Sequence, residues 1–514
     1  MTPPPVFLIG AGPGDPGLIT VRGLECLRTA DVVIHDHRVS QRLLKQARAD
    51  AEVINIGSAA ARAMAQEAIS YLIADKAREG KRVARVMYGD PFLFDRGGEE
   101  ALFLREQGVP IEVIPGVPAG IAVPAYTGIP VTYPGAGDTL TLVRGYEDEN
   151  GTPPDVDWAS LSRLEGTIVC YASPQQLPLI LEAMLASGWP ADDDGVIVYQ
   201  GTLASQATVA GTMQSLLESV RDANARRETA ILIVGRVVGF REHLRWFDAR
   251  PLFGRRVLVT RPRDQAVELV EQLESLGAEA VEAPMIRIAP PEDPGPLLAA
   301  AGAPDAFDWI VFTSANAVES FMTALLDGAR DIRALNGPQL CTVGTGTAER
   351  LARYGLKVDL VPDEFRAEAV VDAIVQRGSV QGSRILLPRS NIGREVIGDR
   401  LRQLGATVVE VVAYHTELQD SQRPDDPDVY GMLLNGRLDA VTFTSASAVR
   451  NFVTIYGADQ AVDLLANTVV AAIGPVTADA ARELGIAVNV QPAEYTVRAL
   501  VDALAAQLGP RAKA

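Results

Sequence analysis

Short apolar segments alternate with amphipathic segments along the first half of the chain. The apolar segment Val6–Ile9 leads into the glycine-rich turn Gly10–Pro16, and the apolar spacing over Leu18–Leu27 predicts a helix. The same reading predicts strands at Asp31–Ile34 and Arg82–Val86 and helices at Gln66–Arg78 and Gly98–Gln107. This alternation predicts α/β layers with a largely parallel sheet.

A second lobe is expected after the turn at residues 134–138. Its predicted strands are Thr139–Arg144, Thr167–Tyr171, Gly195–Gln200 and Ala230–Val234. An arginine-rich connector follows at residues 240–252. We therefore predict a first module over residues 1–247, with lobes at about 5–134 and 138–247.

The second half of the chain contains an internal repeat, in which one sequence pattern occurs twice. Residues 308–318 (DWIVFTSANAV) recur as 439–449 (DAVTFTSASAV), 343–348 recur as 473–478, and 256–262 recur as 384–390. So long a period excludes a solenoid and indicates a duplicated α/β unit. Proline-rich, acidic segments at 289–296 and 420–427 enclose one copy, so the halves should interleave. We expect a domain over 252–514, with lobe one at 255–280 plus 419–510, lobe two at 290–406, and crossing strands at 281–288 and 407–415.

Composition restricts the kinds of function. The 514 residues carry a net charge of −18, which argues against a nucleic-acid partner and means that an anionic ligand would need arginines concentrated at its site. No apolar run reaches a membrane span and no secretion signal is present, so a cytoplasmic protein is expected. The cysteines Cys26, Cys170 and Cys341 are far apart, which argues against a disulfide framework or a zinc site. His35 and His37 share a strand face but lack a third ligand nearby, so no metal is predicted.

Three loops rich in glycine and proline follow predicted strands in the first module. In the first, Gly10, Gly12 and Gly14 suggest a dinucleotide fingerprint, but Asp15 follows where a third spaced glycine is needed to start the helix. A nicotinamide site, a purely structural turn and a different nucleoside-binding loop all remain open. The other two loops lie at 88–100 and 113–132, and all three should meet at the carboxyl edge of the sheet, where α/β proteins bind ligands.

Read together, these segments resemble the tetrapyrrole methylase family, specifically uroporphyrinogen-III C-methyltransferases, over about residues 5–247. The matching segments are 6–16 (VFLIGAGPGDP), 30–36 (ADVVIHD), 89–92 (GDPF), 96–100 (RGGEE), 128–130 (GIP) and 233–238 (IVGRVV). The resemblance implies S-adenosylmethionine as cofactor, a tetrapyrrole as substrate, and Asp36 in a catalytic role that removes a ring proton or orients the macrocycle. It places the cofactor against Pro13, Gly89, Asp90, Leu93, Pro118, Ala119, Ala172, Gly201 and Ala230.

Several positions depart from the family pattern. Ser58 and Met87 stand where lysines are expected, Tyr133 and Pro134 replace a histidine and an arginine, and Pro118 and Ala172 replace a threonine and a methionine. Fewer cations weaken the hold on a substrate with eight carboxylates. The first module is therefore either an active methyltransferase or a methylase-like module that only binds or docks.

The duplicated half resembles uroporphyrinogen-III synthase over about residues 252–510. The resemblance rests on 257–262, the two FTS segments, 413–416 (AYHT), 473–478 and 495–500 (YTVRAL). It implies cyclisation of hydroxymethylbilane to uroporphyrinogen III without a cofactor. Tyr414 matches the tyrosine proposed to help water leave, and Ser314, Ser445 and Thr477 match polar cleft positions. Both serines would also cap helices, a role compatible with carboxylate binding.

Arginines after the paired strands of the second half are further candidates for substrate binding. Arg261 is the first of them, and Arg263, Arg389 and Arg394 occupy similar places, although solvated surface arginines are an equal possibility for any one. The sequence thus indicates a fused α/β enzyme of tetrapyrrole biosynthesis that leads toward sirohaem or cobalamin. If the chain forms a homodimer, the contact is expected to be made by the methylase half. A two-lobed ligand carrier without catalysis is the more distant alternative.

Overall fold

The computed structural model describes residues 3–57, 64–147, 151–164, 166–222, 228–362, 367–391, 396–418 and 427–509. These residues form four β-sheets with helices packed against them, which confirms the predicted α/β class. The described residues within 1–257, 271–280 and 504–509 make one compact unit. The described residues within 258–270 and 281–503 make the other.

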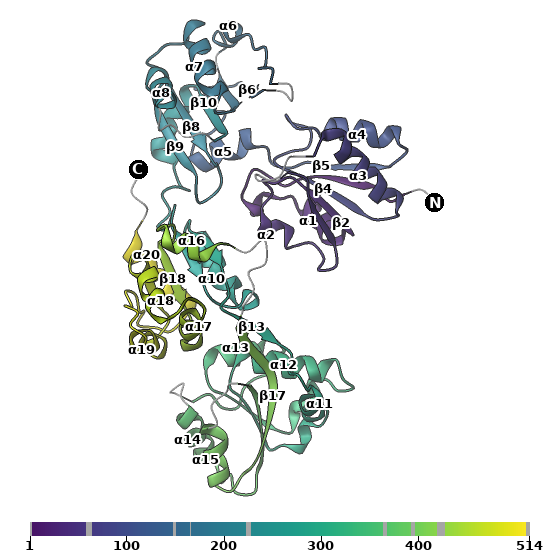
Figure 1. Ribbon diagram of the computed structural model, residues 1–514, viewed down its shortest axis with the longest axis vertical. Helices are drawn as coiled ribbons and strands as arrows, with labels where there is room; N and C mark the ends of the chain where they lie inside the picture. Colours follow the sequence, from purple (N-terminus) through teal and green to yellow (C-terminus); the bar gives the residue numbers. More distant parts are fainter. Residues whose placement is uncertain are drawn as a thin grey trace. The chain divides into compact units, whose positions relative to one another are not determined.

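The first lobe contains a five-stranded parallel sheet in the order β3-β2-β4-β1-β5 (Figure 1). Its strands are β1 (Val6–Gly10), β2 (Val32–His35), β3 (Glu52–Asn55), β4 (Val83–Met87) and β5 (Ile111–Ile114). Helices α3 (Gln66–Arg78) and α4 (Gly97–Glu106) pack on one face, and α1 (Val21–Thr29) and α2 (Gln41–Leu44) pack on the other. Because both faces are covered, β1, β2 and β4 are buried along their whole length.

The second lobe contains a mixed sheet in the order β6-β7-β10-β8-β9. Its strands are β6 (Leu140–Gly145), β7 (Thr167–Ala172), β8 (Asp194–Tyr199), β9 (Ala207–Thr212) and β10 (Ala230–Val234). Only β6 and β7 run parallel. The alternation that predicted a largely parallel sheet was that of the first lobe, and the sheet of the second lobe is mostly antiparallel. β10 enters antiparallel between β7 and β8, and the short connection after β8 lets β9, which the sequence did not predict, return as an antiparallel edge.

Helices cover both faces of this mixed sheet as well. α7 (Gln176–Ala186) and α8 (Met213–Arg221) pack on one face. The other face is covered by α5 (Ala119–Thr127) and the 3₁₀ turn η2 (Arg236–Phe240). Two short helices complete this part of the chain, α6 (Trp158–Leu161) and α9 (Arg241–Leu244). α5 matters for the site below because it joins the third loop of the first lobe to the second lobe.

The C-terminal half contains the sheets β12-β11-β18-β19 and β13-β17-β16-β14-β15. The strands of the first are β11 (Arg256–Val259), β12 (Glu279–Glu282), β18 (Ala440–Phe443) and β19 (Val469–Ala472). Those of the second are β13 (Ile286–Ala289), β14 (Trp309–Phe312), β15 (Gln339–Thr342), β16 (Arg384–Ser390) and β17 (Thr407–Leu418). The chain thus starts one sheet, completes the other, and returns to finish the first.

Two segments that the sequence assigned to strands crossing between the lobes form an antiparallel pair, β13 with β17. The first is shorter than the predicted 281–288, because residues up to Glu282 belong to β12 and continue the sheet of the other lobe. Residues 419–426, which include most of the predicted boundary at 420–427, lie outside the described residues.

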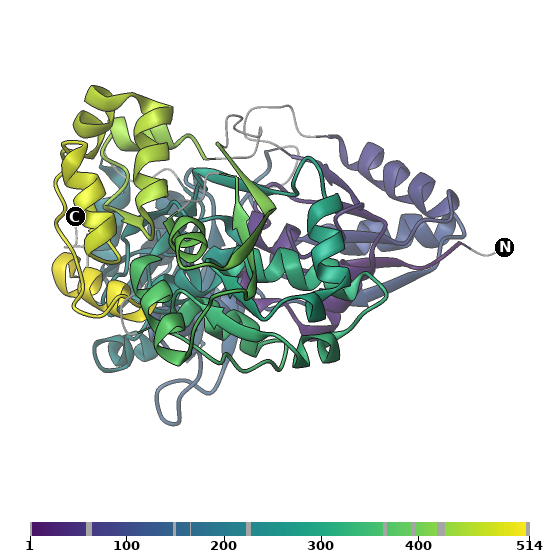
Figure 2. The same ribbon diagram turned by 90° about the horizontal axis from the view of Figure 1, so that it is seen from below.

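Helices pack around the strands of each lobe of this half. The lobe built on the sheet β12-β11-β18-β19 has α10 (Arg263–Ser275), α16 (Val429–Leu434), α17 (Ala446–Tyr456), α18 (Ala458–Leu465), α19 (Pro475–Glu483) and α20 (Val497–Leu508). The other lobe has α11 (Gly295–Gly302), α12 (Ala315–Leu326), α13 (Thr345–Ala352), α14 (Ala367–Arg377) and α15 (Val396–Gln403). The yellow-green helices of the C-terminal lobe gather around its strands in both views (Figures 1 and 2).

The duplication seen in the sequence extends to individual contacts. The Ser314 hydroxyl accepts a hydrogen bond from the Ala317 N–H at 3.1 Å, and the Ser445 hydroxyl accepts one from Ala448 at 3.2 Å. These bonds cap α12 and α17 in the same way. Equivalent edge-to-face ring pairs form behind the two caps, at 5.5 Å for Phe312–Phe321 and 5.7 Å for Phe443–Phe452.

Within the described ranges, no helix has the length and apolar content needed to cross a bilayer. Cys26, Cys170 and Cys341 are all buried free thiols. Across the same ranges, no three histidine, cysteine, aspartate or glutamate side chains are grouped so that they could hold a metal ion.

Candidate functional site

The three predicted loops meet at the carboxyl ends of β1, β4 and β5. Gly12 and Gly89 exchange backbone hydrogen bonds of 3.2 and 2.9 Å, which fasten the first loop to the second. A side chain on Gly10 would put its Cβ 2.4 Å from the Gly116 nitrogen, and one on Gly116 would come within 2.1 Å of the Gly89 carbonyl oxygen. Glycine is required there because the backbones themselves are in contact. The result is a fixed rim of main chain at the edge where α/β sheets bind ligands.

Asp90 holds this rim together. One carboxylate oxygen accepts a hydrogen bond of 2.9 Å from the Phe92 N–H, and the other accepts one of 2.9 Å from the Gly116 N–H. The carboxylate therefore joins the second loop to the third. Leu93 continues the second loop, and its N–H donates a hydrogen bond to the Asp90 carbonyl oxygen. Of the expected cofactor contacts, Gly89, Asp90 and Leu93 thus lie together in one loop.

The second lobe is attached to the first loop by hydrogen bonds. The Pro13 carbonyl oxygen accepts a hydrogen bond from the hydroxyl of Thr202, in the second lobe, at 3.3 Å. It also accepts one from the hydroxyl of Tyr88, in the second loop of the first lobe, at 2.6 Å. The Asp15 N–H donates to the Thr202 hydroxyl at 3.1 Å, and the Asp15 carboxylate accepts from Tyr126 at 2.7 Å. The two lobes therefore hold a common orientation at the rim.

Helix α5 is adjacent to several of the other expected cofactor positions. Pro118 is the N-cap residue of this helix and Ala119 its first residue. Gly201 lies against the helix, since a Cβ there would approach Val123 Cγ2 to 2.5 Å. The Gly120 N–H lies in the first turn, where it has no acceptor within the helix, and it donates to the Tyr171 hydroxyl at 2.6 Å.

Ala172 and Ala230 are the remaining expected cofactor positions. They face each other across β7 and β10, and both are buried. Ala172 follows Tyr171, so both alanines lie close to the first turn of α5. The structure thus places the sequence-predicted positions around the junction of the two lobes.

Asp36 lies at the end of β2 and is held from two sides. One carboxylate oxygen pairs with the Arg85 guanidinium at 2.8 Å, and the other accepts the Tyr88 N–H at 3.0 Å. Arg85 also pairs with Glu100 at 3.1 Å, and both of these side chains are buried. Burial raises the pKa of Glu100, although the Arg85 charge opposes this shift. Asp36 is therefore a fixed carboxylate with its remaining surface toward solvent.

Sequence reasoning missed Arg85 and the buried role of Glu100. The available signal was the one arginine inside the otherwise apolar segment 83–87, because a buried charge requires a charged partner. The partners lie 49 residues before and 15 residues after it in the sequence, so the pattern alone did not identify them.

Phe94 marks the point where the second loop meets the second lobe. Its φ of 56° is in the left-handed region, which is unfavourable for a bulky side chain. Two residues of the second lobe hold it there. Tyr171 packs edge-to-face at 5.2 Å, and the Tyr146 hydroxyl donates to the Phe94 carbonyl oxygen. Backbone strain of this kind concentrates at ligand sites.

Asp95 follows Phe94 and brings a second carboxyl group to this region. It keeps exposed surface, but protein atoms from the surrounding walls crowd its carboxyl group. Burial raises the pKa of Asp95 to about 6, and the negative charge of Asp36 adds to the shift. The Tyr146 hydroxyl is also influenced by Asp95, which further raises its pKa above the value that burial alone gives.

The positions that depart from the family pattern have varied surroundings. Met87 is fully buried, so no cation could be exposed there without a different backbone. Tyr133 is exposed and packs against Phe240 with ring centroids 4.2 Å apart. Ser58 lies outside the described residues.

Two of the residues predicted for the synthase half come together. The hydroxyl groups of Ser314 and Tyr414 are 3.0 Å apart, although the residues are separated by 100 positions in the sequence. Ser314 ends the loop after β14, and Tyr414 lies in β17, whose pairing with β16 is irregular between Arg389 and Ser390. Tyr414 is mostly buried, with 7% of its surface exposed. The pair places two hydroxyl groups at one edge of the lobe-two sheet.

The other predicted synthase residues lie at equivalent or neighbouring edges. Ser445 caps α17, and Thr477 is buried in the first turn of α19. Arg261 lies two residues after the end of β11. Arg389 is paired with Glu410 at 2.8 Å, and Arg394 lies outside the described residues. A hydrogen bond between Gln265 and Asn316 joins the loop regions of the two lobes close to Ser314.

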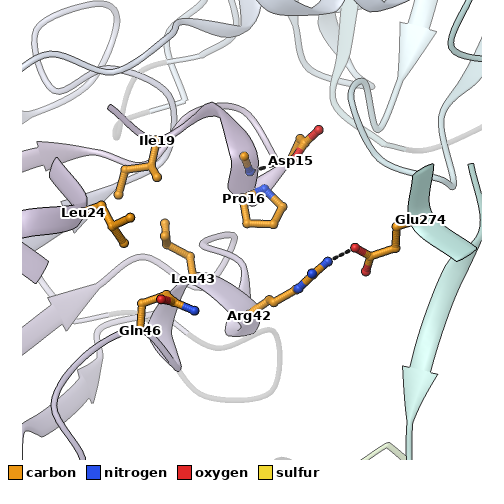
Figure 3. A pocket seen from close by; sticks show the side chains of 9 residues that line it. Asp15, Pro16, Ile19, Leu24, Arg42, Leu43, Gln46 and Glu274 are labelled. Atoms are coloured by element: carbon orange, nitrogen blue, oxygen red, sulfur yellow. Dashed lines mark hydrogen bonds and ion pairs between the residues drawn. The ribbon is translucent and has the colours of Figure 1, made fainter. Parts of the chain in front are cut away.

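A cavity of about 340 Å³ lies behind the first glycine loop (Figure 3). Its lining is apolar at Ile19, Leu24 and Leu43, and Arg42 forms an ion pair with Glu274 at its edge. Asp15 and Pro16 border it from the loop, but no residue that the sequence assigned to a catalytic or binding role lines it.

Comparison with known proteins agrees with both halves of this description. Residues 5–217 match the family model of tetrapyrrole (corrin/porphyrin) methylases, and residues 267–502 match that of uroporphyrinogen-III synthase HemD. The porphyrin biosynthesis protein HemD of Ruminiclostridium josui is 34% identical over 500 residues, which cover 97% of each chain. The uroporphyrinogen-III C-methyltransferase of Bacillus subtilis is 32% identical over 71% of this chain and 75% of that protein. The sirohaem synthase of Thiobacillus denitrificans is 40% identical over 47% of this chain and 50% of its own.

The glycine-loop rim and the duplicated lobes therefore define an enzyme of tetrapyrrole biosynthesis in which two families are fused. The chain belongs to the family of the HemD porphyrin biosynthesis protein, with a tetrapyrrole methylase domain followed by a uroporphyrinogen-III synthase domain.

Proposed function

We propose that this chain catalyses two consecutive reactions. Its C-terminal half cyclises hydroxymethylbilane to uroporphyrinogen III, and its N-terminal half transfers methyl groups from S-adenosylmethionine to that product to give precorrin-2. The observation that carries the proposal is the presence of both domains in one chain that aligns with a HemD relative over 97% of its length. Precorrin-2 would serve either sirohaem or cobalamin synthesis.

In the synthase reaction the enzyme must help the terminal hydroxyl group of hydroxymethylbilane to leave and then bring the two ends of the chain together. The Tyr414 hydroxyl, oriented by the Ser314 hydroxyl at 3.0 Å, is the candidate proton donor for that departure. The capped N-termini of α12 and α17 offer backbone N–H groups that favour carboxylates. Holding the flexible chain in a folded conformation accounts for much of such catalysis, because it converts ring closure into a local event.

In the methylase reaction the cofactor supplies an electrophilic methyl group on sulfonium. The glycine rim fits such a ligand, because Gly10, Gly89 and Gly116 leave only main chain at the carboxyl edge. The residues that would hold it are Pro13, Gly89, Asp90, Leu93, Pro118, Ala119, Ala172, Gly201 and Ala230. Asp36, fixed by Arg85 and the Tyr88 N–H, would orient a pyrrole N–H or accept a ring proton through its open surface.

A second possibility is that the methylase half binds its ligands without turnover. The observation that favours it is the state of Asp36, since each carboxylate oxygen already has a partner in Arg85 or Tyr88. To accept a ring proton, either oxygen would have to share or give up its present contact. In that case the synthase would be the only active half.

One experiment separates these possibilities. The full chain is given hydroxymethylbilane with and without S-adenosylmethionine, and the products are separated by chromatography and identified by mass. Uroporphyrinogen III alone in the first reaction and a dimethylated product in the second support the proposal. Isomer III in both reactions without methylation supports the binding module. Only isomer I, the product of spontaneous closure, in both reactions would contradict the proposed synthase.

A further inference from the structure

Arg38 and Arg144 are two arginines of the methylase half for which no acidic partner is found among the described residues. Arg38 lies two residues after Asp36 in the loop that follows β2 of the first lobe, and Arg144 lies on the edge strand β6 of the second lobe. In the described part of the chain, neither guanidinium lies within ion-pair distance of a carboxylate. Most arginines nearby differ, because Arg22, Arg48, Arg78 and Arg85 are all ion-paired.

Aromatic rings position both guanidinium groups. The Arg38 guanidinium carbon is 4.1 Å from the centroid of the Tyr88 ring, a cation–π distance. Tyr88 is itself immobilised, because its hydroxyl donates to the Pro13 carbonyl oxygen at 2.6 Å. Arg144 lies 5.8 Å from the centroid of the Tyr146 ring, and the Tyr146 hydroxyl is bound to the Phe94 carbonyl oxygen. Each cation is thus held against a ring that is tied to the glycine rim.

Both supporting rings are connected to the second loop, because Tyr88 belongs to that loop and the Tyr146 hydroxyl donates to the carbonyl oxygen of Phe94 within it. Both guanidinium groups act on the Tyr146 hydroxyl, whose pKa is raised mainly by burial and is lowered by each of them. The charge of Asp95 raises the pKa of Tyr146, and no ion pair between Asp95 and either arginine is found among the described residues. Asp36 is already paired with Arg85. Two cations from opposite lobes therefore face one region with an incomplete set of counter-charges.

This arrangement answers a question raised by the sequence. The chain lacks cations at Met87 and Tyr133, yet its proposed methylase substrate carries eight carboxylates and the chain as a whole is acidic. Tyr88, beside one of those positions, is the ring that supports Arg38. A planar guanidinium donates two parallel hydrogen bonds to a carboxylate and retains its charge at any working pH.

We propose that Arg38 and Arg144 form a carboxylate-binding subsite in the methylase cleft, which holds acetate or propionate side groups of the tetrapyrrole. The subsite rests on the proposed function for the identity of its ligand. One arginine from each lobe lets it clamp a macrocycle across the junction. It sets substrate affinity and orientation and takes no part in the methyl transfer.

The test compares the variants Arg38→Gln, Arg144→Gln and the double variant with the wild-type full chain. The matched control is Arg105→Gln, because Arg105 is an exposed arginine of α4 without an ion-pair partner in the described residues. The double variant is expected to raise the KM for uroporphyrinogen III about tenfold or more, with kcat and the Kd for S-adenosylmethionine within about twofold of wild type. Lysine at both positions should restore part of the affinity. A KM equal to that of Arg105→Gln would overturn the subsite.

A second measurement keeps the proposal testable if the methylase half does not turn over. Uroporphyrin III, the oxidised octacarboxylate, is titrated against each full chain by its fluorescence, and the synthase rate of the same preparation reports folding. Loss of one class of binding sites in the double variant, with an unchanged synthase rate, supports the subsite even where methylation is absent. Identical titrations for the wild-type chain, the double variant and Arg105→Gln would overturn it, whatever the methylation result.

Discussion

The Tyr414 hydroxyl lies 3.0 Å from the Ser314 hydroxyl, and the Ser314 hydroxyl also accepts the Ala317 N–H at the start of α12. The cap thus fixes the serine, and the serine fixes the tyrosine. The equivalent cap in the other lobe is Ser445, which makes the same bond to Ala448. The two serine caps occupy equivalent places in the two copies of the repeat, and the Ser314 cap differs in that its hydroxyl also contacts Tyr414 of β17.

Replacing Tyr414 with phenylalanine should slow formation of isomer III by at least about tenfold, because the reaction loses a proton donor to the departing hydroxyl group. The ring stays in place, so the melting temperature should change little. The check is the ratio of isomers I and III after chemical oxidation of the products. An unchanged rate and isomer ratio would remove Tyr414 from the mechanism.

Asp36→Ala should reduce methylation about a hundredfold or more and leave the synthase rate unchanged, because the two activities belong to different domains. It should also lower the stability of the methylase half, since the buried Arg85 would keep only Glu100 as its counter-charge. Radiolabelled methyl transfer and thermal unfolding measure the two effects. Wild-type methylation in this variant would exclude a catalytic role for Asp36.

Gly116→Ala should abolish binding of S-adenosylmethionine, because the new Cβ would lie 2.1 Å from the Gly89 carbonyl oxygen and push the loops apart. Gly239→Ala is the matched control, since no heavy atom lies within 4 Å of its Cβ position and its backbone is not left-handed. Calorimetric titration with the cofactor tests both. Equal affinity in the two variants would show that the rim does not hold the cofactor.

Asp95 predicts a dependence of stability on pH. Its pKa in the folded protein is raised to about 6, so the folded state binds the proton more tightly than the unfolded chain does. The stabilisation from the protonated form is therefore complete below about pH 4 and is lost as the pH rises through about 6. Asp95→Asn does not ionise, so its melting temperature relative to wild type should rise between pH 4.5 and pH 7.5. A difference that stays constant over this range would contradict the shifted pKa.

The sequence by itself determined the α/β class, the glycine loops and the duplication of the second half. These features are local or repetitive. A strand such as Val6–Gly10 is buried because its own residues are apolar, and the repeat is visible wherever two segments carry the same letters. Glycines at Gly10 and Gly116 could be assigned to a loop rim for the same reason, since their spacing after strands is a property of the chain.

Only the tertiary structure decided which distant residues became partners. Three of these partnerships join segments that are far apart along the chain. They are the ion pairs of Arg85 with Asp36 and Glu100, the packing of Arg38 on the Tyr88 ring, and the antiparallel pairing of β10 with β7 and β8. Pairing of this kind depends on how whole layers pack, because a buried charge or strand edge takes whichever partner the packing brings to it. Residue spacing in the sequence carries no information about that choice.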